Sequence, residues 1–143
     1  MTETGSGVPN VISLTKNSST FNSALKSPPD SLWTALTTVF KQLELPVATS
    51  HPQRFFIGTT TFKTRRIEGK PISYYFDCPG EAYGNSASTG DVYLSVYAQL
   101  NRMNAGTELL MTPTAIVVSQ TGNRGSCTSS GKLEARIEKA LQR

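Results

Sequence analysis

Apolar residues recur at every second position through the middle of the chain, and this alternation limits the fold more than any other feature. In the clearest case, from Val92 to Leu100, Val, Leu, Val, Ala and Leu take one side while Tyr, Ser, Tyr and Gln take the other. A period of two is typical of a β-strand with one buried face. After the turn at Asn104-Ala105-Gly106, a second alternation from Leu109 to Val117 predicts the returning strand of a hairpin.

Helical spacing occurs on both sides of this strand-rich region. After Pro28-Pro29-Asp30, a wide apolar stripe predicts an amphipathic helix that ends before Pro46; it consists of Leu32, Trp33, Leu36, Val39, Phe40 and Leu43. Leu133, Ile137 and Leu141 predict a short closing helix, with Lys132, Glu134, Arg136, Glu138 and Lys139 facing outward. Because consecutive strands with short turns pair antiparallel, the sequence predicts an α+β fold: an antiparallel β-meander sheet with two helices packed on one face, a two-layer sandwich.

The rest of the chain completes a single domain. Further strands are expected at residues 20–26, 47–50, 54–61, 62–67 and 72–78, with polar loops at 79–90 and 122–131. Residues 1–9 are typical of a flexible linker or an added expression tail, and residues 10–143 are expected to form one α+β domain. We expect one core that contains Trp33, Leu36, Phe40, Leu94, Val96, Met111, Val117 and Ile137.

Two cysteines, Cys78 and Cys127, stand where a predicted strand meets a loop and where a loop meets a helix. This placement favours a disulfide, which would stabilise the fold by about 4 kcal/mol for a loop of this length. Two free thiols in a cytosolic protein are the alternative, although neither cysteine has a CxxC or metal-site neighbour. A bridge would indicate an exported protein, in the periplasm or outer membrane, and free cysteines a cytoplasmic one.

No catalytic, cofactor-binding or metal-binding residues can be named. The single histidine, His51, precedes a proline in a predicted turn, and the carboxylates are scattered singly. The glycine-rich stretch before Lys132 fails as a phosphate loop, since Leu133 stands where a serine or threonine is needed, although an anion site with Arg124 and Lys132 remains an alternative. We therefore expect a protein that is not an enzyme.

A basic and aromatic concentration provides one candidate contact surface, formed by Lys63, Arg65, Tyr93 and Tyr97 on neighbouring predicted strands. Such a face can hold single-stranded nucleic acid, but a net charge of +4 with irregular spacing favours another envelope protein or polymer instead. The sequence contains neither a membrane-spanning run nor a signal peptide. Attachment to a membrane is therefore expected only through a lipid anchor that has been removed.

The segment from Pro29 to Thr59 resembles an uncharacterised class of bacterial envelope lipoprotein domains. It has a helix with an early tryptophan, Trp33, the exit Leu43-Glu44-Leu45-Pro46-Val47 and the strand Phe56-Ile57-Gly58-Thr59. The layout is similar to that of BamC-type lipoprotein domains, and the segments Tyr75 to Cys78 and Cys127 to Glu134 also resemble that uncharacterised class. The resemblance covers roughly residues 20–141 and implies an exported domain that works by binding or scaffolding.

A second layout must be weighed against this one. A strand, a Pro-Pro-Asp segment, a Trp-containing helix, a meander and a closing helix are also similar to helix-grip domains, which hold a small molecule or lipid under a long terminal helix. The predicted closing helix here is short, which favours a filled core. A helix-grip ligand carrier is therefore the alternative function, and a filled core or an internal cavity distinguishes the two.

Overall fold

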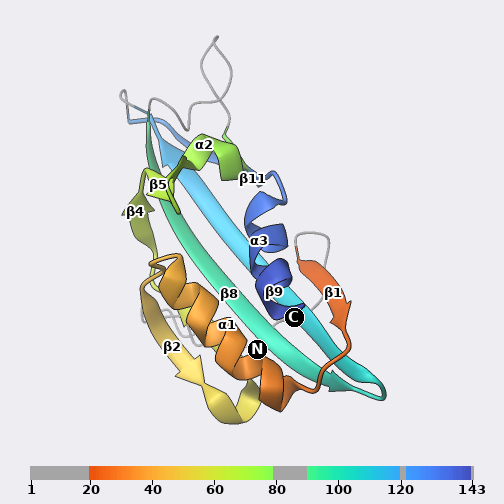
Figure 1. Cartoon of the computed structure of the whole chain (residues 1–143). Coiled ribbons are helices and arrows are strands. Elements are labelled where there is room, and N and C mark those ends of the chain that lie inside the picture. Colours follow the sequence, from red (N-terminus) through yellow and green to blue (C-terminus); the bar gives the residue numbers. More distant parts are fainter. Residues whose placement is uncertain (1–19, 79–89, 120–121, 143) are drawn as a thin grey trace, which may run out of the picture.

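The computed structural model describes residues 20–78, 90–119 and 122–142, which form one large antiparallel sheet with helices on one face (Figure 1). Its strands run in the order β1-β9-β8-β3-β2, with β4 beside β8 and β10 beside β9. The strand bounds are β1 Phe21–Leu25, β2 Val47–His51, β3 Phe56–Thr59, β4 Phe62–Thr64, β8 Asp91–Met103, β9 Gly106–Val118 and β10 Arg124–Ser126. The α+β class and the large antiparallel sheet expected from the sequence are confirmed.

Two helices, α1 (Pro29–Gln42) and α3 (Lys132–Leu141), contact each other and lie on β8 and β9 (Figure 1). One end of the sheet carries two small antiparallel pairs and a short helix, and a 3-10 turn follows β2. Their bounds are β5 Arg66–Ile67 with β6 Lys70–Pro71, β7 Phe76–Asp77 with β11 Thr128–Ser129, α2 Ile72–Tyr75 and η1 Pro52–Arg54. The helices thus cover one face of the sheet and leave the other without a helical layer in the described parts of the chain.

The β8–β9 hairpin forms the centre of the sheet, and its register runs without interruption from Asp91 opposite Val118 to Met103 opposite Gly106. The side chains that alternation assigned to the helix-facing side are all buried: Val92, Leu94, Val96, Ala98 and Leu100 on β8, and Leu109, Met111, Ala115 and Val117 on β9. The predicted hairpin is confirmed, because strict alternation leaves only one register that buries all of these residues.

The core lies between this hairpin and the two helices. Of the residues expected there, Leu36, Phe40, Leu94, Val96 and Ile137 are completely buried, and Met111 and Val117 nearly so. Trp33 is only partly buried and packs against the edge of the core, with its ring edge-on to Phe55 at a centroid distance of 6.1 Å. Its expected place inside the core is therefore confirmed only in part.

Three short segments differ from their sequence-based expectation. β1 pairs with β9, not with a neighbour in sequence, so the sheet departs from a simple meander at this edge. Residues 72–78 were expected to form a strand, but Ile72 and Tyr75 are buried on one side of a helical turn and only Phe76–Asp77 is extended. The stretch 122–131, expected as a loop, contributes β10 and β11. The expected linker at residues 1–9 and a short apolar run at residues 11–14 lie outside the described residues.

Candidate functional site

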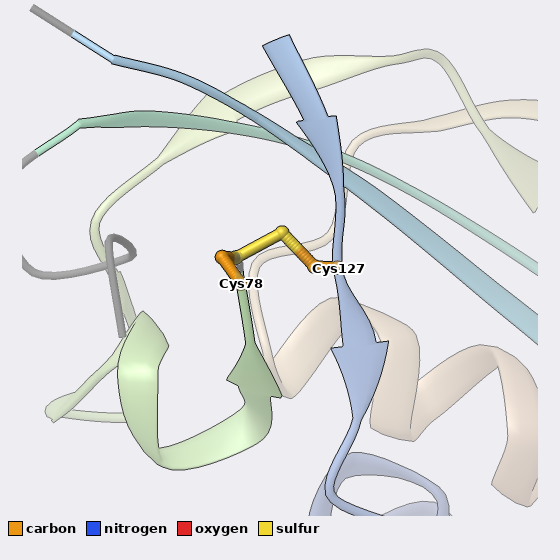
Figure 2. Close-up of a disulfide and its surroundings, with 2 residues drawn as sticks. All are labelled: Cys78 and Cys127. Atoms are coloured by element: carbon orange, nitrogen blue, oxygen red, sulfur yellow. A yellow bond between two sulfur atoms is a disulfide. The ribbon is translucent and has the colours of Figure 1, made fainter. Parts of the chain in front are cut away.

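Cys78 and Cys127 form a disulfide, which confirms the expected bridge (Figure 2). Cys78 directly follows β7, and Cys127 stands between β10 and β11. The Cα atoms of the two cysteines are 4.1 Å apart. Cys78 is 2% exposed and belongs to the core. A disulfide at this position is consistent with an oxidising, exported location for the protein.

Backbone hydrogen bonds continue the connection on both sides of the bridge. The amide of Cys127 donates to the carbonyl of Ala115 on β9 at 2.9 Å, and the amide of Ser130 donates to the carbonyl of Tyr75 at 2.8 Å. β7 and β11 pair between these points, with Thr128 opposite Asp77. The start of α3 is therefore tied to the main sheet and to α2 by covalent and hydrogen-bonded links.

The four residues predicted as a contact surface lie on the sheet face that turns away from the helices. Lys63 on β4 pairs directly with Tyr93 on β8, and opposite residues of an antiparallel pair point to the same face. Tyr97 follows four positions along β8 on that face. Arg65 extends the surface beyond β4, where its guanidinium lies 3.5 Å from the carboxylate of Asp91. The tertiary structure thus brings these four side chains to one face of adjacent strands.

Tyr97 is held rigidly within this surface. Its ring stacks on Phe56 of β3 with a centroid distance of 5.8 Å and an interplanar angle of 19°. It also lies against Gly58, where an added Cβ would come within 2.3 Å of the Tyr97 Cδ1 atom. Burial raises the pKa of the Tyr97 hydroxyl above its ordinary value. A side chain fixed in this way loses little conformational entropy when a partner binds.

The described residues show no arrangement typical of a catalytic centre. No three His, Cys, Asp or Glu side chains in that part of the chain are grouped so that they could hold a metal ion. His51 lies in β2 with its ring 6.2 Å from that of Phe56, and it forms no hydrogen bond to a described Ser, Thr or Cys side chain. Lys132, which the sequence suggested as part of an anion site, places its ammonium 4.9 Å from the centre of the Tyr74 ring.

Clefts between described residues at the rim of the domain include four with volumes of about 420, 330, 500 and 460 Å³. None of them is lined by Leu36, Leu94 or Ile137, the fully buried residues at the centre of the core. The centre of the space between the helices and the sheet contains one cluster of buried hydrophobic side chains from both layers. A helix-grip carrier would need its cavity at that place.

One of these clefts contains a residue that sequence reasoning placed wrongly. Glu134 on α3 was expected to face outward, but its exposed fraction is only 6%. Both of its carboxylate oxygens accept from the Ser129 hydroxyl, at 2.8 and 2.9 Å. Helical spacing did contain a signal, because Glu134 stands three residues before Ile137 and seven before Leu141 on the buried stripe. The 460 Å³ cleft opens at this carboxylate.

None of the described helices is both long and apolar enough to cross a membrane. Comparisons with protein-family models, curated proteins and solved structures found no match to this chain.

Proposed function

We propose that this protein is a non-enzymatic domain of the bacterial cell envelope, located in the periplasm or at the outer membrane, that binds a partner protein through the helix-free face of its sheet. The observation that carries the proposal is the group of Lys63, Arg65, Tyr93 and Tyr97 on this face. Tyrosine and arginine are enriched at protein interfaces, where they combine apolar contact area with hydrogen bonding.

The charge of this surface favours a partner with acidic groups. Arg65 has Asp91 as its carboxylate neighbour, whereas Lys63 makes no ion pair with any described residue. An acidic side chain of a partner could therefore pair with the Lys63 ammonium group without first breaking an ion pair within this protein. Further along β8 on the same face, the Tyr97 ring, held against Phe56 and Gly58, supplies a preorganised apolar contact. The disulfide supports the extracytoplasmic location.

Site-specific photo-crosslinking in cells of the producing organism tests the proposal. A photoreactive phenylalanine at position 93 is expected to capture one defined envelope protein, whereas the same group at exposed Thr38 on α1 should not. Lys63→Glu should reduce the yield at position 93, because it places a negative charge against an acidic partner. Equal capture at positions 93 and 38, or alkylatable thiols in protein isolated without reductant, would contradict the proposal.

The helix-grip alternative has one observation in its favour. The clefts of about 330 and 500 Å³ share Ser27 and Leu141 and adjoin one another where α1, β1 and the end of α3 meet. Pockets for small molecules fall in this volume range. Native mass spectrometry of protein purified from its own cells would reveal a retained lipid or small molecule, and its displacement by Ala35→Trp would favour this alternative.

A further inference from the structure

The sheet edge next to α3 is interrupted at the middle of β9. β1 pairs with β9 up to Met111, and β10 pairs with it from Ile116 onward. Within the described ranges, no strand pairs with residues 112–115 on this side, although β11 contacts β9 close by. Pro113 stands in the gap, and because proline has no backbone N–H it could not donate to a neighbouring strand there.

A backbone acceptor faces this gap. The carbonyl of Ala115 points to this edge, since it accepts the amide of Cys127 at 2.9 Å. In an antiparallel sheet, alternate residues direct their backbone groups to the same side, so the carbonyl of Pro113 points the same way. Val96, which lies opposite Pro113 on β8, supports this orientation. Its amide points away from β9 and donates to the Thr59 hydroxyl at 3.0 Å, so Val96 and Pro113 form a pair without hydrogen bonds between them.

The gap opens into the cleft of about 460 Å³, at which the Glu134 carboxylate is buried. The cleft is lined by Thr20, Phe21, Pro113, Cys127, Thr128, Ser129 and Glu134. This lining contains a carboxylate, hydroxyls, a backbone carbonyl and an aromatic ring, but no cationic side chain. Glu134 is therefore the one charged side chain among these lining residues.

Among the described residues, the Ser129 hydroxyl is the side-chain donor to the Glu134 carboxylate. The hydroxyl of Ser129 accepts from the Gly131 amide at 3.0 Å and donates to the carboxylate, so this network also orders the start of α3. The Ser129 hydroxyl has one proton, whereas the Glu134 carboxylate can accept several hydrogen bonds. The N-terminus of α3 adds only about half a positive charge. A nearly buried carboxylate with unused acceptor capacity favours a cationic group that brings further N–H donors.

We propose that this cleft binds a cationic group with N–H donors, a primary ammonium or a guanidinium. Glu134 is its ion partner, the Pro113 carbonyl is a second acceptor, and Phe21 contacts the alkyl stem. The group is either a free amine or the side chain of a lysine or arginine in a partner segment. This site lies at a sheet edge on the helix side, so it does not depend on the contact surface proposed above.

Titration with n-butylammonium, followed by ¹H–¹⁵N spectra, tests the site. We expect saturable shifts of the Thr128, Ser129 and Ala135 amides, while n-butanol, which has the same stem without the charge, causes none. Glu134→Gln should weaken binding about tenfold or more, since a charged hydrogen-bond pair is lost. Glu138→Gln is the matched control: it lies one turn further along α3, bonded to Ser23 outside the cleft, and should bind as the unchanged protein does.

A lysine-containing pentapeptide separates the two sources of the cation. Binding at least about tenfold tighter than n-butylammonium assigns the site to a partner's side chain, and equal binding assigns it to a free amine. Equal shifts with n-butanol, equal losses in both glutamine variants, or a response to Ca²⁺ but not to the amine would overturn the proposal. If Glu134→Gln does not fold, the comparison of n-butylammonium with n-butanol on the unchanged protein decides.

Discussion

Arg136 on α3 and Glu68 in the turn between β5 and β6 form a two-pronged ion pair: Nε donates to Oε1 and Nη2 donates to Oε2, both at 2.8 Å. The two residues are far apart in sequence, and the pair joins the closing helix to the small β5–β6 hairpin. The hydrogen bond from Arg136 lowers the pKa of the Glu68 carboxyl below its ordinary value.

Because the pKa of Glu68 is lower in the folded state, its contribution to stability is complete above the ordinary carboxyl pKa and is lost as pH falls through the folded value. We expect Glu68→Gln to lower the free energy of unfolding at neutral pH and to flatten its decrease in acid, measured by urea unfolding across that range. The effect should be small, because both side chains are partly exposed. Glu44→Gln is the control, since Glu44 makes no ion pair with the described residues and has a left-handed backbone like that of Glu68. An equal effect of both substitutions on the free energy of unfolding would contradict a role for the Arg136–Glu68 pair.

Removal of the disulfide should destabilise the fold without changing its topology. The bridge closes a loop of 49 residues, so the double variant Cys78→Ala with Cys127→Ala should lose about 4 kcal/mol by the chain-entropy model. Guanidinium unfolding monitored by circular dichroism measures the loss. Adding reductant to the double variant should change nothing, and a double variant as stable as the oxidised protein would show that the bridge has no stabilising role.

Gly58 is required by the ring of Tyr97. A Cβ at position 58 would meet the Cδ1 atom of Tyr97 at 2.3 Å, so Gly58→Ala must displace the ring from its stack on Phe56. We expect a loss of about 1–3 kcal/mol in the free energy of unfolding. In a double-mutant cycle, Gly58→Ala should cost much less when Tyr97 is also replaced by alanine. Additive losses would mean that the two residues do not interact.

Two aromatic residues of α1 should differ in their importance. Phe40 is completely buried, so Phe40→Ala should cost about 3–5 kcal/mol. Trp33 is only partly buried and contacts Phe55 at the core edge, so Trp33→Ala should cost less than that. Thermal and urea unfolding of both variants give the comparison. A larger loss for Trp33→Ala would mean that the edge contact with Phe55 is more important than its exposure indicates.

Much of the candidate contact surface could be expected from the sequence, whereas the cleft at Glu134 could not. Tyr93 and Tyr97 follow from the alternation of β8, because the opposite face of that strand is continuously apolar. Lys63 joins them only because β4 pairs with β8 in one particular register. The cleft arises where two strands that are distant in sequence, β1 and β10, both pair with β9 and leave a gap between them.

The sequence alone determined the elements whose side-chain period is sustained: the β8–β9 hairpin, the apolar stripes of α1 and α3, and the face that each of them buries. Over such lengths only one conformation buries the repeating apolar positions together. Tertiary structure decided the short elements, namely the helical turn at Ile72–Tyr75, β10, β11 and the position of β1 beside β9. A segment of two to five residues buries too little surface to select its own conformation, so the neighbours it packs against, and here the disulfide, make that selection.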